Sequence, residues 1–236
     1  MLPQDRLIVA LDVDTLDEAR RLVEPLSGRV GMFKVGLQLY HSVGSEAIDL
    51  IHRMGGRVFA DFKFHDIPNT AAQAARAVTR RGVAMFNLHA AGGREMLSAA
   101  VRASREEAVA LGQASPLCLA VTVLTSLDER VLRQEVGITK PLERVVVDWA
   151  VLAREAGVDG VVASPWEIKA IRAACGQEFA IVTPGVRPAG SRQDDQRRVM
   201  TPAEALRAGA TYIVVGRPIT AAPDPREAVE RLLEEG

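Results

Sequence analysis

The chain has 236 residues, of which 48% are hydrophobic, 25% are charged and only 4% are aromatic, and its formal net charge is −1. A balance this close to neutral argues against nucleic acid or an anionic membrane surface as a partner, because both attract strongly basic proteins. No apolar run approaches the roughly 20 residues that span a bilayer, and residues 1–11 lack the features of a signal peptide, so we expect a cytoplasmic enzyme.

Short apolar runs, typical of buried parallel strands, alternate with segments of helical periodicity along the chain. In chain order, strands are predicted at Leu7–Leu11, Met32–Val35, Val58–Phe62, Met85–His89, Leu117–Val123, Gly160–Ala163, Ala180–Val182 and Tyr212–Val215. Helices are predicted at Leu16–Leu26, Ser45–Arg53, Asn69–Arg81, Arg94–Ala110, Pro141–Ala156, Glu167–Ala174, Pro202–Ala208 and Pro225–Glu234. Several of these helices begin with a capping residue or an early proline.

The alternation continues without a composition break, a low-complexity tract or a long linker. It predicts an α/β fold, a single (β/α)₈ TIM barrel spanning residues 1–236, with a doubly wound sheet of similar length as the alternative. Polar residues favour the barrel, because several lie where predicted strands end, at the rim that carries the chemistry of barrel enzymes. These residues are Asp12, Lys34, Asp61, Lys63, His89 and Thr122.

Charged residues of alternating sign lie at or just beyond the C-terminal ends of the first three predicted strands. Side chains two apart on a strand share a face, so Asp61 and Lys63 are predicted to point one way and Phe62 the other. A solvated surface ion pair is the simpler interpretation of Asp-x-Lys, but the apolar flanks favour a partly desolvated pair with perturbed pKa values. With Asp12 and Lys34, these residues can form a network in which each ammonium offsets the desolvation of a neighbouring carboxylate.

Glycine and arginine follow the last two predicted strands, in the segments Pro184-Gly185-Val186-Arg187 and Gly216-Arg217. Glycine lets backbone amides approach an anion, and arginine matches phosphate geometry. Taken singly, each segment is an ordinary turn beside a solvated arginine. Barrels frequently bind phosphate at these two loops, so the pair predicts a phosphate site. The polar stretch 189–198 has the composition of a loop that could close as a lid, with Gln196 donating to the phosphate.

Other chemistries find little support in the sequence. The spacing of His41, His52 and His65 matches no metal-binding pattern, so no metal and no cofactor are predicted. His89 is expected to be a hydrogen-bonded interior residue. Cys118 and Cys175 are too few for a disulfide framework or a zinc site and are expected to be buried.

Seven motifs occur in the order known from one enzyme family. They are Ala-Leu-Asp12, Phe-Lys34-Val-Gly, Asp61-Phe-Lys63-Phe-His-Asp66-Ile-Pro-Asn-Thr70, Val-Thr122-Val-Leu-Thr-Ser, Thr-Pro-Gly-Val-Arg187, Asp-Gln196-Arg-Arg-Val and Val-Gly216-Arg217-Pro-Ile-Thr. On these residues the chain resembles the bacterial orotidine 5'-phosphate decarboxylases over essentially its whole length. The resemblance implies cofactor-free conversion of orotidine monophosphate to uridine monophosphate and CO₂, the last step of pyrimidine biosynthesis.

The resemblance also implies a role for each matching residue. Lys63 would donate a proton to C6 of the pyrimidine, Asp61 would face the departing CO₂, and Lys34 would neutralise Asp61. Asp66, the fourth implied catalytic residue, and Thr70 would reach into the neighbouring subunit's site and contact the ribose, which makes the working unit a homodimer.

The remaining implied contacts are all with substrate. Asp12 would hold a ribose hydroxyl and Thr122 would contact the pyrimidine, while the phosphate would be held by Arg187, Gln196, Gly216 and Arg217; Ile67 and Pro184 complete the binding set. One departure is Phe62, where leucine is more usual in the family. It is expected to face away from the ligand and to affect only local packing.

Two other functions remain open. The Asp-x-Lys-x-x-Asp pattern also occurs in keto-sugar-phosphate decarboxylases and hexulose-phosphate synthases, which use a divalent metal. The Asp-Ile-Pro-Asn-Thr run and the long loop between Arg187 and Gln196 argue against them. The last alternative is a barrel that binds a phosphorylated ligand without catalysis, and the complete set of charges argues against it.

Overall fold

A computed structural model describes residues 3–187 and 200–234. The strands are β1 (Leu7–Ala10), β2 (Met32–Val35), β3 (Val58–Phe64), β4 (Met85–His89), β5 (Leu117–Val121), β6 (Gly160–Val162), β7 (Ala180–Thr183) and β8 (Tyr212–Val215). Each strand pairs in parallel with the next, and β8 pairs with β1, which closes the barrel. The predicted (β/α)₈ fold is therefore confirmed, and the doubly wound sheet is wrong.

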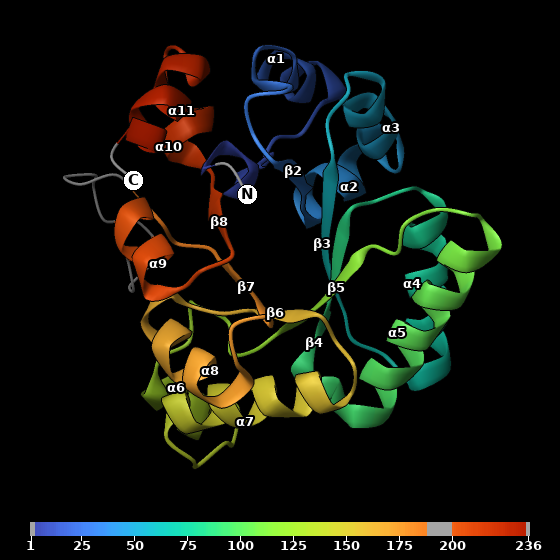
Figure 1. The fold of residues 1–236 in the computed structure, drawn as a ribbon, viewed down its shortest axis with the longest axis vertical. Coiled ribbons are helices and arrows are strands. Elements are labelled where there is room, and N and C mark those ends of the chain that lie inside the picture. Colours follow the sequence, from blue (N-terminus) through green and yellow to red (C-terminus); the bar gives the residue numbers. More distant parts are fainter. Residues whose placement is uncertain (1–2, 188–199, 235–236) are drawn as a thin grey trace.

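The helices surround the strands (Figure 1). They are α1 (Leu16–Leu26), α2 (Leu37–Val43), α3 (Glu46–Arg53), α4 (Pro68–Arg80), α5 (Gly93–Ala110), α6 (Glu129–Gln134), α7 (Leu142–Glu155), α8 (Ile168–Cys175), α9 (Pro202–Ala208), α10 (Arg217–Thr220) and α11 (Pro225–Glu234). Short 3₁₀ turns lie at Pro3–Arg6, Ala90–Gly92 and Pro165–Glu167. None of the helices in the described part of the chain is both long and apolar enough to cross a membrane.

Helix starts follow the expected capping chemistry. Thr15 accepts a hydrogen bond from the backbone of Glu18, whose side chain accepts one from the backbone of Thr15 in return. The same reciprocal arrangement joins Thr201 and Glu204 at the start of α9. Each capping box satisfies backbone N–H groups that the first turn of a helix leaves without partners, and so places the helix start in the sequence.

Successive apolar side chains along the strands belong to two separate clusters, one on each face of the barrel sheet. On β1, Leu7 and Val9 belong to the large cluster between barrel and helices, whereas Ile8 and Ala10 belong to a smaller cluster with Phe59 and other strand residues. Because successive side chains on a strand point to opposite faces, this smaller cluster fills the barrel interior. Members of this cluster at the C-terminal ends of the strands, such as Ala10, line the cavity of the candidate active site. Cys118 and Cys175 are buried as expected.

The structure differs from the sequence predictions mainly at element ends. β3 continues to Phe64, so Lys63 lies within the strand, whereas β5 ends at Val121. The helices α2, α6 and α10 were not expected, because seven, six and four residues are too few to show a clear helical period.

Candidate active site

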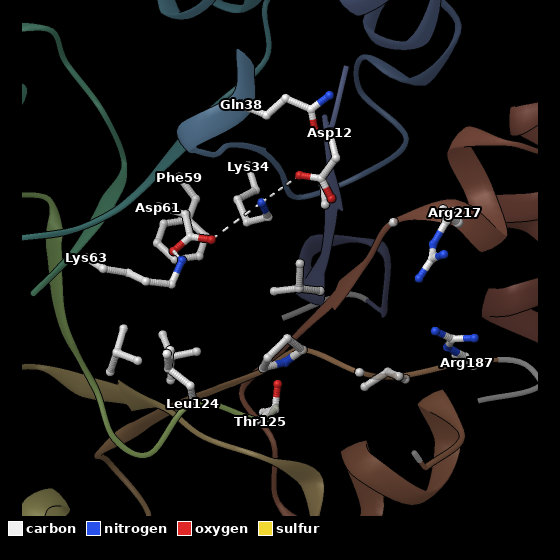
Figure 2. A pocket seen from close by; sticks show the side chains of 18 of the residues that line it. Asp12, Lys34, Gln38, Phe59, Asp61, Lys63, Leu124, Thr125, Arg187 and Arg217 are labelled. Carbon is white, nitrogen blue, oxygen red and sulfur yellow. Dashed lines mark hydrogen bonds and ion pairs between the residues drawn. The ribbon is translucent and has the colours of Figure 1, made fainter. Parts of the chain in front are cut away.

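A cavity of about 580 Å³ opens where the strands end. Its lining includes Asp12, Lys34, Asp61 and Lys63 from the first three strands and their following loops. It also includes Arg187 from the loop after β7 and Arg217 from the start of α10, just after β8. The four charges of the first group lie together, and the two arginines lie across the cavity from them (Figure 2). The barrel thus brings both sequence-predicted charge groups to one site.

The expected charge network is present. Asp61 Oδ1 lies 2.7 Å from Lys63 Nζ, and Asp61 Oδ2 lies 3.5 Å from Lys34 Nζ. Lys34 Nζ also lies 3.1 Å from Asp12 Oδ1. Only 14% of the Asp61 side chain and 12% of the Lys34 side chain are exposed, against 58% for Asp12. The centre of the network is therefore desolvated, and its interactions are stronger than those of a surface ion pair.

Asp61 is held in its charged form. Burial acts to raise the pKa of Asp61, but the charges of Lys34 and Lys63, together with hydrogen bonds from Lys63 and Asn87, outweigh it and leave the pKa below its usual value. Near neutral pH the cavity therefore presents a buried carboxylate between two ammonium groups.

Lys63 and Asp61 meet at an irregular point of β3. Lys63 has a φ of 51°, and it is the only non-glycine residue with positive φ in the described part of the chain. The pairing of β3 with β4 shifts register between Ala60 and Phe64. The predicted proximity of Asp61 and Lys63 is confirmed, but the regular strand alternation used to predict it does not hold there. Phe62 does point away from the cavity, packing on Tyr40 with ring centroids 4.4 Å apart.

The opposite side of the cavity fits an anion. Only 9% of the surface of Arg187 is exposed. Its backbone N–H donates to Met200 O at 3.1 Å, which ties the segment after β7 to the residue two positions before α9. Gly185 has a φ of 79°, a conformation that side chains disfavour. Pro184 and Gly216 also line the cavity. Gln196 lies outside the described residues.

Thr122 does not line the cavity. Its side chain is fully buried, and its hydroxyl donates to Val162 O at 3.1 Å, so it joins β5 to β6. The cavity wall on this side is formed by Val121, Val123, Leu124 and Thr125 instead. Among the residues of the Val-Thr-Val-Leu-Thr motif, the hydroxyl available to a ligand in the cavity is that of Thr125.

Asp66, Ile67 and Thr70 also lie outside the cavity lining. All three are exposed around the start of α4, and Ile67 keeps 67% of its surface exposed. Asp66 Oδ1 accepts a hydrogen bond from the Ile67 backbone at 2.7 Å, which fixes the turn before the helix. In this chain these three residues therefore do not line the cavity that holds the charge network.

Several residues of the site were not singled out from the sequence. Gln38, Phe59, Leu124 and Thr125 line the cavity, and Asn87 Nδ2 donates a hydrogen bond to Asp61 Oδ1 of the charge network at 2.7 Å. The position of Asn87 two residues before His89, on the same face of a strand, was the available signal. His89 itself is hydrogen-bonded as expected, because its Nδ1 accepts from the Ala91 backbone at 3.3 Å.

The chain is similar to several known proteins. A relative named orotidine 5'-phosphate decarboxylase from Moorella thermoacetica is 62% identical, over 100% of this chain and 93% of the relative. One of the same name from Heliobacterium modesticaldum is 58% identical, over 100% of this chain and 97% of the relative. The crystal structure of orotidine 5'-phosphate decarboxylase from Lactobacillus acidophilus superimposes with a TM-score of 0.86 at 37% identity, over 97% of each chain.

The match extends to the family as a whole. Residues 5–232 fit the model described as the orotidine 5'-phosphate decarboxylase / HUMPS family. With nearly the whole chain matched, and with the charge network and the arginine pair at the rim of a closed barrel, the protein belongs to the orotidine 5'-phosphate decarboxylase / HUMPS family.

Proposed function

We propose that this protein decarboxylates orotidine 5'-monophosphate to uridine 5'-monophosphate without a cofactor, as the last step of pyrimidine nucleotide synthesis. The observation that carries the proposal is the buried Lys34–Asp61–Lys63 network facing Arg187 and Arg217 across one cavity. One side suits a reaction that develops negative charge on carbon, and the other suits a phosphate. The names of relatives more than half identical to the chain point to the same substrate.

In the proposed reaction, the bond between C6 and the carboxyl carbon breaks, CO₂ leaves, and the electron pair stays on C6. The Lys63 ammonium stabilises this charge and then gives a proton to C6. At about 4 Å and an effective dielectric near 20, one ammonium contributes on the order of 4 kcal/mol, or about three decades in rate if it acts only in the transition state. Asp61 faces the departing carboxylate, and Lys34 keeps Asp61 ionised.

The substrate's phosphate would supply binding energy remote from the reacting carbon. Arg187, Arg217, Pro184 and Gly216 surround the proposed phosphate position, with Gln196 as a further donor. Charge-assisted hydrogen bonds contribute about 1.5–3 kcal/mol each, which can hold the pyrimidine against the charge network. Asp12, which contacts Lys34, would accept a hydrogen bond from a ribose hydroxyl.

For the pyrimidine itself we propose a contact with Thr125 in place of Thr122. The Thr125 side chain lines the cavity, whereas the hydroxyl of Thr122 is already committed to Val162 O. The two residues are three positions apart in the same motif, so the proposed contact still comes from a threonine of that motif.

We also propose that the working unit is a homodimer. Asp66, Ile67 and Thr70 are exposed at the start of α4 and do not line the cavity of their own chain. A second copy related by a two-fold axis could receive these side chains at its site, since the same patch then serves both subunits.

The metal-dependent sugar-phosphate reactions fit this cavity less well. Those reactions need carboxylates that are free to bind a divalent cation. Here Asp61 contacts two ammonium groups and Asp12 contacts one, so the positive charge beside each acid comes from lysine.

An absorbance assay tests the proposed function. Orotidine monophosphate is added to the purified protein, the ultraviolet absorbance is followed, and the product is identified by chromatography. We expect conversion to uridine monophosphate at the same rate with and without a chelator. Activity abolished by the chelator and restored by magnesium would identify a metal-dependent relative, and tight binding without conversion would identify a sensor.

A further inference from the structure

The irregular pairing of β3 with β4 leaves part of β3 without regular backbone partners. Ala60 pairs with Phe86 and Phe64 pairs with Leu88. Between these two pairs, residues 61–63 of β3 lie opposite a single residue of β4. Asp61 and Lys63 both lie in this bulge, and the residue opposite it on β4 is Asn87. The two residues that carry the proposed chemistry are therefore held by a segment that the backbone ladder of the sheet does not fix.

The amide of Asn87 takes the place of the missing ladder. Asn87 Oδ1 accepts from the Lys63 backbone N–H at 2.7 Å, and Asn87 Nδ2 donates to Asp61 Oδ1 at 2.7 Å. The orientation of the amide is set by chemistry, because a backbone N–H can only donate and the ionised carboxylate can only accept. The side chain of Asn87 is fully buried, so water does not compete for either bond.

Both hydrogen bonds hold a group that is energetically unfavourable in its position: one holds a strained backbone and the other a buried anion. A non-glycine residue at positive φ, such as Lys63, is strained and persists only where its surroundings hold it in place. Asp61 is a buried anion whose Oδ1 accepts from both Lys63 Nζ and Asn87 Nδ2. When Lys63 gives its proton to the substrate, its attraction for Asp61 weakens, whereas the neutral amide of Asn87 keeps its bond.

We propose that Asn87 is a positioning residue, which holds the strained backbone of Lys63 and the carboxylate of Asp61 in the geometry that decarboxylation requires. The role demands one acceptor and one donor on a short planar side chain. Leucine, which has a similar shape, supplies neither, and aspartate supplies the acceptor but a donor only when protonated. The inference rests on the proposed decarboxylation.

The first test separates positioning from mere stability. In Asn87→Leu protein, kcat for orotidine monophosphate should fall by about 10- to 1,000-fold, because one neutral and one charge-assisted hydrogen bond are lost. KM should change by less than about threefold, since the phosphate contacts remain. The matched control is Thr79→Val, which removes a buried hydroxyl bonded to Ala75 O and Ser104 Oγ between α4 and α5, away from the cavity. Its kcat should stay within about twofold of the parent even where its Tm falls.

The second test uses Asn87→Asp, which keeps the shape and the bond to the Lys63 backbone. Burial and Asp61 act to raise the pKa of the introduced carboxyl group, whereas Lys34 and Lys63 act to lower it. His65 and His89 lie nearby, and burial, followed by the charges of His65 and Lys63, lowers the pKa of His89. While protonated, the introduced group donates to Asp61 as the amide does; once ionised, it repels Asp61. We therefore expect kcat to fall as pH rises, with KM again close to that of the parent.

The outcomes are distinct. Parent-like kcat and an unchanged pH profile in both Asn87 variants would overturn the proposal. It would also be overturned if Asn87→Leu protein lost no more kcat than Thr79→Val protein at the same loss of Tm. If the parent protein itself does not convert orotidine monophosphate, the proposed function fails. The urea stability of Asn87→Asp then still tests the hydrogen bonds: the deficit relative to the parent should grow as pH rises, and a deficit independent of pH would contradict them.

Discussion

Lys63 Nζ lies 2.7 Å from Asp61 Oδ1, and the two residues meet within a bulge of β3 where Lys63 has a φ of 51°. The ammonium and the carboxylate thus come from positions two apart in the sequence without regular strand geometry between them. Their contact depends on how β3 is held against β4, and it brings the proposed proton donor next to the carboxylate that Lys34 also contacts.

Removing the Lys63 ammonium should remove most of the chemical step. In Lys63→Ala protein we expect kcat to fall by about three orders of magnitude, because the ammonium contributes on the order of 4 kcal/mol toward the charge on C6. The control is Lys140→Ala, which removes an exposed lysine paired with Asp148 and should leave kcat unchanged. Folded Lys63→Ala protein with near-parental turnover would refute the role given to Lys63.

Removing an arginine from the proposed phosphate side should lower kcat/KM only for substrates that carry the phosphate. Arg217→Ala should lower kcat/KM for orotidine monophosphate by about 10- to 150-fold, which corresponds to about 1.5–3 kcal/mol for a charge-assisted hydrogen bond. For orotidine, which lacks the phosphate, parent and variant should agree within about threefold. Arg231→Ala, at an exposed arginine paired with Glu227, is the control. An equal loss on both substrates would place Arg217 elsewhere in the mechanism.

Thr122 and Thr125 are predicted to respond differently to loss of the hydroxyl. Thr125→Val should lower kcat/KM by about 3- to 10-fold through loss of one neutral hydrogen bond to the pyrimidine. Thr122→Val should lower Tm, because it leaves the bond to Val162 O unmade, with little change in kcat/KM at a temperature where it is folded. The reverse pattern in steady-state kinetics and thermal melts would return the pyrimidine contact to Thr122.

The stability supplied by Asp61 should depend on pH in a defined direction. Burial opposes ionisation, but Lys34, Lys63 and Asn87 outweigh it, so the folded-state pKa of Asp61 lies below the unfolded value of about 4. A lowered pKa means that the contribution is fully present above the unfolded pKa and is lost as pH falls through the folded one. The difference in unfolding free energy between parent and Asp61→Asn, measured in urea, should therefore shrink as pH falls below about 4. A difference that stays constant would contradict this assignment.

A site shared between subunits predicts complementation. The protein should sediment at twice its chain mass of 25.4 kDa. Asp66→Ala and Lys63→Ala proteins, each inactive, should regain about a quarter of the parental activity when equal amounts exchange subunits, because half of the dimers are then mixed and each has one intact site. Mixing either variant with itself is the control. Mixtures that exchange subunits and stay inactive would count against sharing.

The barrel and the position of its charged rim could be read from local patterns. Apolar runs such as Val58–Phe62 identify parallel strands, and the helical segments between them identify crossovers. A strand that is buried on both faces is apolar at nearly every position, so it can be recognised from its own few residues. Asp12, Lys34, Asp61 and Lys63 were found because they lie at or just beyond the C-terminal ends of such runs. Helices α2 and α6 were missed because their lengths are below two turns.

The amino-acid sequence by itself determined which residues reach the carboxyl end of the barrel, since this follows from strand period and chain order. Only the tertiary structure decided how they act together: that Lys63 takes a left-handed backbone, that Asn87 bonds it and Asp61, and that Thr125 in place of Thr122 lines the cavity. Register and hydrogen bonding between neighbouring strands set these features, and both depend on contacts between residues far apart in the chain.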